Sequence, residues 1–185
     1  MMKLLCRAGA SLALGLLLVS VSRADTPREG EPAPAVELPA AYAGKAITGK
    51  KDGAMLSLKD FQGKKNVVLF FYPKAMTPGC TVESCGFRDV SDKFARLDTV
   101  VIGVSTDPVD LQKQFIAKEK LNFPLLADGD KEIAKRFGVL NDRGMANRVT
   151  FVIDKQGNIA KVYSKVTPKG HPEEVLKFVE QLGKN

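Results

Sequence analysis

The chain has 185 residues, of which 44% are hydrophobic and 26% charged, so it is suited to one globular domain rather than to a disordered segment. Its formal net charge is +7, but the basic residues are dispersed and form no block interleaved with aromatic residues. We therefore expect no nucleic-acid partner. The sequence contains no internal repeat and no low-complexity tract, which argues against a repeat architecture.

The first 24 residues have the layout of a secretory signal peptide. Lys3 and Arg7 precede an apolar run, Leu12–Val21, which is followed by the small-x-small site Ser22-Arg23-Ala24. Cleavage there would leave residues 25–185 as a single mature domain. We expect export to the bacterial periplasm.

The leader's apolar run is about half the ~20 residues that a membrane-spanning helix needs, so we expect no stable membrane insertion. An uncleaved leader that serves as an anchor is the alternative. Cys6 belongs to this leader and is left out of the site chemistry, so the mature chain keeps two cysteines, Cys80 and Cys85.

In chain order, the first mature stretch, residues 25–39, holds four prolines and predicts an extended segment rather than a helix. Residues 42–53 predict a loop or hairpin. A continuous apolar run, Val67–Phe71, ends before Pro73 and predicts a strand buried on both faces.

Residues 80–97 predict an amphipathic helix, and residues 100–104 predict a second buried strand. This strand–helix–strand unit should place its two strands in parallel. The residues expected on the inner face of the helix are Val82, Phe87, Val90, Phe94 and Leu97.

The rest of the chain predicts a helix from Pro108 to about Lys120, a shorter one over residues 130–137, a hairpin over residues 150–163 and an amphipathic helix over residues 172–182. This order of elements indicates an α/β protein with a thioredoxin-like fold. We expect a mixed central sheet flanked by helices on both faces.

The chemistry is expected at Cys80, which follows a turn-rich loop and lies in the first turn of a helix. Free N–H groups and the helix dipole favour an anion there. An ordinary thiol, with a pKa of about 8.5, is only about 3% thiolate at pH 7, and making a thiol mostly ionised requires about 3 kcal/mol. A helix terminus typically gives less than ~1 kcal/mol, so a second positive group is needed.

The segment Pro73-x-x-x-Thr77-x-x-Cys80 matches the active-site pattern of the peroxiredoxins. Together with Cys85, other blocks resemble the subgroup called bacterioferritin comigratory protein or peroxiredoxin Q. These blocks are Phe71-Tyr72-Pro73-Lys74, Thr77-Pro78-Gly79-Cys80-Thr81, Phe87-Arg88-Asp89, Gly103-Val104-Ser105, Phe123-Pro124-Leu125-Leu126-Ala127-Asp128, Arg148-Val149-Thr150-Phe151-Val152-Ile153-Asp154 and Gly170-His171. The likeness covers roughly residues 30–182.

The resemblance implies a role for each of five residues. Cys80 would be the peroxidatic cysteine and Cys85 the resolving one, while Thr77 would hydrogen-bond the peroxide and Pro73 would shield the thiolate from water. Arg148 would be the missing cation, which stabilises the thiolate and the charge that develops on the peroxide oxygens. Taken alone, Arg148 would be an ordinary salt-bridged strand residue.

The resemblance also implies the reaction and the partners. The protein would be an antioxidant thiol peroxidase that reduces hydrogen peroxide and organic hydroperoxides through a sulfenic acid and a Cys80–Cys85 disulfide. A thioredoxin-like dithiol protein would recycle this redox-active centre. We expect a monomer that needs no organic cofactor and no metal. Ala75 stands where the family often has an acidic residue, so the resemblance does not settle which peroxide is preferred.

A structural disulfide is the simpler interpretation of two cysteines in an exported protein. In a continuous helix, however, the Cα atoms of Cys80 and Cys85 would lie roughly 8.6 Å apart. Disulfides have Cα separations of about 4.4–6.8 Å. We therefore expect the first turns of the helix to unwind during catalysis, helped by the weak helix former Gly86.

Two other functions fit the same fold. A thioredoxin-type disulfide oxidoreductase normally uses Cys-x-x-Cys, a shorter spacing than that of Cys80 and Cys85. A copper-delivery protein would use the two cysteines and His171 as soft ligands. His171 is, however, expected to start a helix or lie on the surface rather than to act as a ligand or base. A catalytically dead binding module is disfavoured by the intact five-residue pattern.

Overall fold

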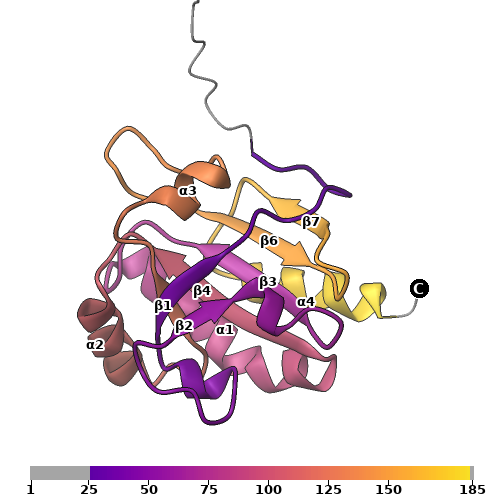
Figure 1. The fold of residues 1–185 in the computed structure, drawn as a ribbon, viewed down its shortest axis with the longest axis horizontal. Helices are drawn as coiled ribbons and strands as arrows, with labels where there is room; N and C mark the ends of the chain where they lie inside the picture. The colour runs from indigo at the N-terminus through magenta and orange to yellow at the C-terminus, as the bar shows by residue number, and fades with distance from the viewer. Residues whose placement is uncertain (1–25, 184–185) are drawn as a thin grey trace, which may run out of the picture.

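The computed structural model describes residues 26–183, and the predicted signal peptide lies outside them. A seven-stranded sheet has the strand order β2-β1-β5-β4-β3-β6-β7 (Figure 1). The strands are β1 (Glu37–Ala41), β2 (Met55–Ser57), β3 (Asn66–Phe71), β4 (Thr99–Ser105), β5 (Leu125–Ala127), β6 (Val149–Ile153) and β7 (Ile159–Tyr163). The helices are α1 (Pro78–Arg96), α2 (Val109–Glu119), α3 (Glu132–Arg136) and α4 (His171–Leu182).

The sheet is mixed, as the order of predicted elements indicated. β3, β4 and β5 run parallel, whereas β6 pairs antiparallel with both β3 and β7. The β3–α1–β4 unit and the β6–β7 hairpin confirm the predicted connections. β1, β2 and β5 were not individually predicted. β2 and β5 have only three residues each, and the prolines up to Pro39 indicated only an extended segment where β1 begins.

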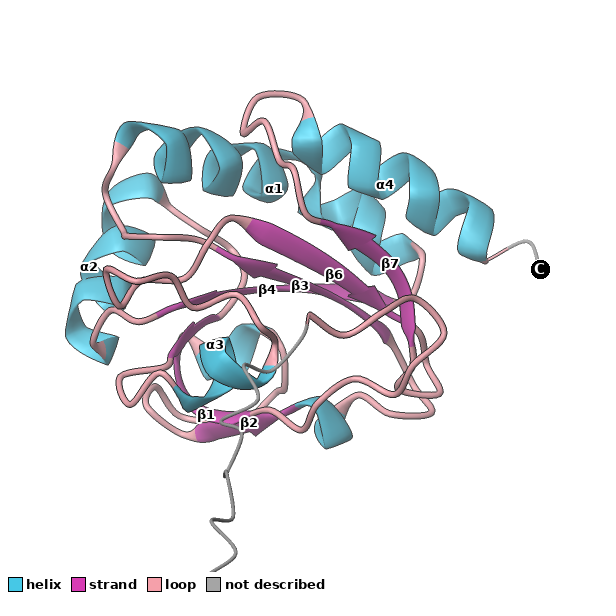
Figure 2. Cartoon of the chain, turned by 90° about the horizontal axis from the view of Figure 1, so that it is seen from above, coloured by secondary structure: helices cyan, strands magenta, loops and turns pink. Residues whose placement is uncertain are grey.

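The sheet has helices on both faces, which confirms the predicted architecture. All six residues of β3 are buried. Since side chains alternate along a strand, Val68 and Phe70 join the core cluster formed with α1, α2 and α4, while Leu69 and Phe71 join the cluster formed with α3 and the N-terminal strands. Figure 2 shows α1 and α4 on one side of the sheet and α3 on the other.

The register between β3 and β6 determines what meets at one end of the sheet. Phe71, the last residue of β3, pairs with Val149, the first residue of β6. Because these strands are antiparallel, the segment that follows β3 therefore lies beside the residue that precedes β6. That residue is Arg148.

The predicted inner face of α1 was wrong at one position. Val82 is 48% exposed, whereas Cys80, Glu83 and Phe87 are buried. At about 100° per residue, Val82 lies roughly 200° around the helix from Cys80. A continuous helix that buries Cys80 must therefore expose Val82.

Gly86 has a packing role that the sequence did not indicate. A Cβ atom at this position would lie 2.8 Å from Cγ of Pro172, in the first turn of α4. The glycine thus permits α1 and α4 to approach closely.

Replacing Gly86 with alanine is expected to destabilise the fold by about 1–3 kcal/mol. The gain in helix propensity is about 1 kcal/mol, but the proline ring is fixed by its backbone and cannot turn away. Urea unfolding of the reduced protein measures the difference, with the exposed α1 substitution Lys93→Ala as control. A Gly86→Ala protein more stable than the wild type would show that α1 and α4 can move apart at little cost in free energy.

Candidate active site

Cys80 is the third residue of α1 and only 1% exposed. The loop after β3 leads into Thr77, whose extended backbone (φ −84°, ψ 151°) forms the N-cap, and Pro78 then occupies the first helical position. The sulfur is therefore held at a helix N-terminus, where unpaired backbone N–H groups favour negative charge.

Arg148 supplies the positive group that was expected beside the Cys80 thiol. Its Nη2 donates to Sγ of Cys80 at 3.2 Å. A Cβ atom at Gly79 would lie 3.3 Å from this Nη2, so the glycine leaves room for the guanidinium. An arginine and a helix terminus thus act on the same sulfur atom.

Glu83, one turn along α1, completes this arrangement and was missed at the sequence level. Its side chain is fully buried, and Oε2 accepts a hydrogen bond from Nη1 of Arg148. Its other oxygen, Oε1, has no hydrogen-bond partner among the described residues. Burial raises the pKa of Glu83 to about 7, although Arg148 acts in the opposite direction.

The raised pKa of Glu83 predicts that stability falls as the pH rises from about 4.5 through 7. Below its ordinary value of 4.5 the carboxyl is protonated in both states; above 7 the folded state must hold a buried charge. The free energy of unfolding falls by roughly 3 kcal/mol across this window, because the folded state binds more protons there than the unfolded state. Glu83→Gln should flatten this pH dependence.

Denaturant unfolding of the reduced protein at several pH values measures this effect. The exposed α4 variant Glu180→Gln serves as control and should keep the wild-type slope. Equal slopes in wild type and Glu83→Gln would mean that Glu83 titrates normally in the folded protein.

The loop beside Cys80 is tied to the end of β4. Oδ2 of Asp107 accepts hydrogen bonds from the backbone N–H of Ala75 at 2.7 Å and from the hydroxyl of Ser105 at 2.9 Å. Thr77 donates its hydroxyl hydrogen to the carbonyl of Lys74 at 2.9 Å, and Pro73 is partly buried. Pro73 and Thr77 thus belong to the loop that leads into α1, and Arg148 contacts Cys80 in the first turn of that helix.

Cys85 lies on the same helix and is half-buried. Both cysteines are free thiols, and α1 runs without interruption from Pro78 to Arg96. The expected helix is therefore present across the pair, and a disulfide would require it to unwind locally.

His171 begins α4, as predicted, but it is buried rather than at the surface. It is 2% exposed, and its Nε2 lies 2.8 Å from Oγ1 of Thr150. Burial lowers the pKa of His171, so the ring is neutral at pH 7. Within residues 26–183, no group of three His, Cys, Asp or Glu side chains is placed to hold a metal ion.

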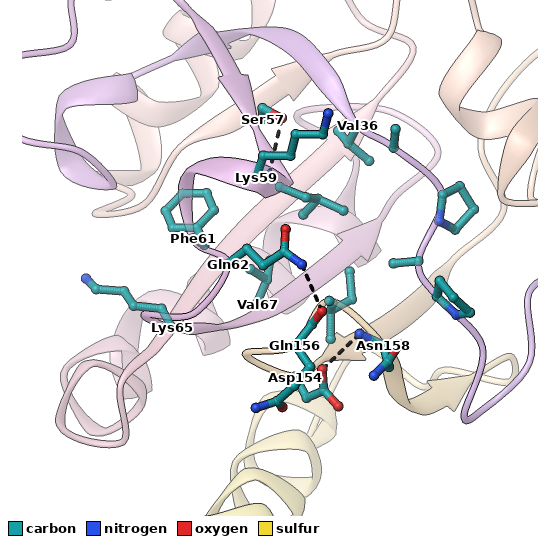
Figure 3. Close-up of a pocket in the computed structure, with 17 residues that line it drawn as sticks. Val36, Ser57, Lys59, Phe61, Gln62, Lys65, Val67, Asp154, Gln156 and Asn158 are labelled. Carbon is teal, nitrogen blue, oxygen red and sulfur yellow. Dashed lines mark hydrogen bonds between the residues drawn. The ribbon is translucent and has the colours of Figure 1, made fainter.

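A cavity of about 330 Å³ lies at the other end of the sheet (Figure 3). Val67 and Ile153, which pair where β3 begins and β6 ends, are part of its lining. Its lining includes apolar side chains, Lys59 and Lys65 but no cysteine or histidine. It is therefore separate from the thiol chemistry.

The sequence profile of the AhpC/TSA family matches residues 30–162. The chain belongs to the AhpC/TSA family. Among its curated AhpC/TSA relatives is a putative peroxiredoxin bcp of Coxiella burnetii, 44% identical over 132 residues, covering 68% of this chain and 87% of the relative. The peroxiredoxin Bcp of Escherichia coli is 38% identical over 138 residues, covering 71% and 88%.

Solved structures agree with this membership. Peroxidoxin BcpB from Mycobacterium tuberculosis superposes with a TM-score of 0.74 at 34% identity, covering 84% of this chain and 98% of that one. A Xanthomonas campestris bacterioferritin comigratory protein, whose alkyl peroxide reduction activity was the subject of its structure, gives a TM-score of 0.71 at 28% identity, covering 80% and 92%. This AhpC/TSA protein is thus a thiol peroxidase, an oxidoreductase with a thioredoxin-like fold.

Proposed function

We propose that Cys80 is the peroxidatic cysteine, which reduces hydrogen peroxide and organic hydroperoxides. The observation that carries this proposal is the 3.2 Å contact between Nη2 of Arg148 and a sulfur held at the N-terminus of α1. The Cys80 thiolate attacks one peroxide oxygen, the O–O bond breaks, and the other oxygen leaves with a proton as water or an alcohol. Cys80 becomes a sulfenic acid.

Arg148 and Thr77 act on the peroxide in this step. The guanidinium stabilises the negative charge that develops on the leaving oxygen. Because Thr77 already donates its hydroxyl hydrogen to the Lys74 carbonyl, its oxygen is free to accept a hydrogen bond from the peroxide O–H. Pro73 limits the access of water to the sulfur.

Cys85 then resolves the sulfenic acid. Its thiol attacks the oxidised sulfur of Cys80, the first turns of α1 unwind, and an intramolecular disulfide forms with the release of water. A thioredoxin-like dithiol protein reduces this disulfide. Since both cysteines belong to one helix, the cycle requires only a monomer.

The site of action that we propose is the bacterial periplasm, reached through the predicted signal peptide at residues 1–24. Among residues 26–183, no helix has the length and apolar character needed to cross a membrane. A mature N-terminus at Asp25, found by mass spectrometry of periplasmic extract, would support export. Protein found only in the cytosol with its leader intact would contradict it.

Treating the reduced protein with one equivalent of hydrogen peroxide tests the proposed cycle. Peptide mapping should find a Cys80–Cys85 disulfide in the wild type. In Cys85→Ser, a reagent that captures sulfenic acids should label Cys80. Labelling of Cys85 in Cys80→Ser, together with an unlabelled Cys80 in Cys85→Ser, would reverse the assigned roles.

A further inference from the structure

The side chain of Cys85 lies between α1 and the end of α2. Nη1 of Arg88 is 3.6 Å from Sγ of Cys85, and Oε2 of Glu119 is 3.8 Å from the same sulfur. Arg88 is one helical turn beyond Cys85, and Glu119 is the last residue of α2. The sulfur therefore contacts one group of each charge.

The same arginine fastens this turn of α1 to α2. Its Nη1 donates to the backbone carbonyl of Glu119 at 2.6 Å. That carbonyl belongs to the last turn of a helix, where carbonyls lack partners within the helix and carry partial negative charge. Asn122, just beyond α2, donates to the hydroxyl of Ser91 at 2.7 Å and to the carbonyl of Arg88 at 3.3 Å.

These surroundings keep Cys85 as a neutral thiol while α1 is folded. Burial is the main cause that raises the pKa of Cys85, and the carboxylates of Glu119 and Asp89 add to it, although Arg88 opposes them. A neutral thiol reacts slowly with peroxide. The sulfur of Cys80, in contrast, accepts a hydrogen bond from Nη2 of Arg148.

We propose that Arg88 and Glu119 form a latch that holds Cys85 in α1, and that opening of this latch limits disulfide formation. This inference rests on the proposed roles of Cys80 and Cys85. Arg88 and Glu119 are positioning residues, since they act through the resolving cysteine and not on the peroxide.

The latch would set the outcome of a competition at Cys80. In one reaction, the thiol of Cys85 attacks the sulfenic sulfur, an S–S bond forms, and the hydroxyl leaves with the thiol proton as water. In the other, the sulfenate takes an oxygen from a second peroxide, whose O–O bond breaks to give a sulfinic acid and water or an alcohol. A slower opening of the latch favours the sulfinic acid.

Rapid quenching after mixing the reduced protein with hydrogen peroxide, followed by peptide mass spectrometry, separates the two steps. Arg88→Gln loses the guanidinium donors, so disulfide formation should be about tenfold faster than in the wild type. The fraction of sulfinic acid at excess peroxide should fall. Arg96→Gln, which makes the same charge change at an exposed position on α1, should match the wild type.

Amide exchange supplies an independent measurement. Residues 81–88 should exchange faster in Arg88→Gln, while β3 and β4 keep wild-type protection. A disulfide step that is unchanged or slower in Arg88→Gln would overturn the latch. Failure of Cys80 to form any sulfenic acid in the wild type would instead overturn the proposed function.

Glu119→Gln tests the electrostatic part of the latch. It keeps the backbone carbonyl that Arg88 contacts but removes the carboxylate charge beside the sulfur. In a Cys80→Ser background, the pH midpoint for alkylation of Cys85 by iodoacetamide should shift downward. Glu180→Gln in the same background is the control, and an unchanged midpoint in Glu119→Gln would show that the carboxylate does not act on Cys85.

Discussion

Cys80→Ser is expected to abolish peroxide reduction while leaving the fold intact. The substitution exchanges sulfur for oxygen at a buried position, so it changes little in the packing of α1. A serine hydroxyl is not appreciably ionised near neutral pH, even beside Arg148, and it cannot form a sulfenic acid. The measurement is peroxide consumption with dithiothreitol as reductant, where activity should fall to the uncatalysed background.

Cys85→Ser is the matched control on the same helix. It should consume one equivalent of peroxide at the wild-type rate and then fail to cycle efficiently with thioredoxin. Sustained turnover by Cys80→Ser would place the reactive sulfur elsewhere. The assignment of the peroxidatic cysteine would then be wrong.

Arg148→Ala should lower kcat/KM for hydrogen peroxide by about 10²–10³-fold, which is typical for the loss of one preorganised donor to a developing anion. The variant loses the contact with the sulfur and leaves the buried Glu83 carboxyl without its partner. Arg148→Lys should give an intermediate rate. Its single ammonium group keeps the positive charge but lacks the two separate nitrogens with which the guanidinium contacts Cys80 and Glu83.

Arg143→Ala is the control for Arg148, since it removes an exposed arginine from the same loop. Stopped-flow mixing of the reduced protein with peroxide isolates the first step from recycling. If the Arg148→Ala rate fell less than threefold, stabilisation of the sulfur and the peroxide would have to come from the helix terminus alone.

The strong local patterns predicted much of the fold. The apolar run of β3, the helical spacing of α1 and the Gly-containing turn between β6 and β7 are each encoded within a few consecutive residues. β5 has only three residues and becomes a strand by pairing with β1 and β4. Such pairing depends on residues far apart in the chain, so the local spacing of apolar residues does not predict it.

The site residues, too, could be predicted from the sequence only where the signal lies in neighbouring residues. The position of Cys80 at a helix start followed from the preceding loop, but no local pattern could place Arg148 beside it, 68 residues later in the chain. The family resemblance supplied that expectation. Glu83 was missed because a charged helix residue is normally exposed. Its spacing of three from Cys80 and four from Phe87 is the signal that places it on the buried face.

The pairing of Phe71 with Val149 has a consequence for refolding. A slip of one residue between β3 and β6 would turn every β6 side chain to the opposite face of the sheet and carry Arg148 away from the sulfur. A chain with the slipped register could still be compact and rich in secondary structure. Recovered peroxidase activity therefore measures the fraction of molecules whose central strands are correctly aligned, which circular dichroism alone does not distinguish.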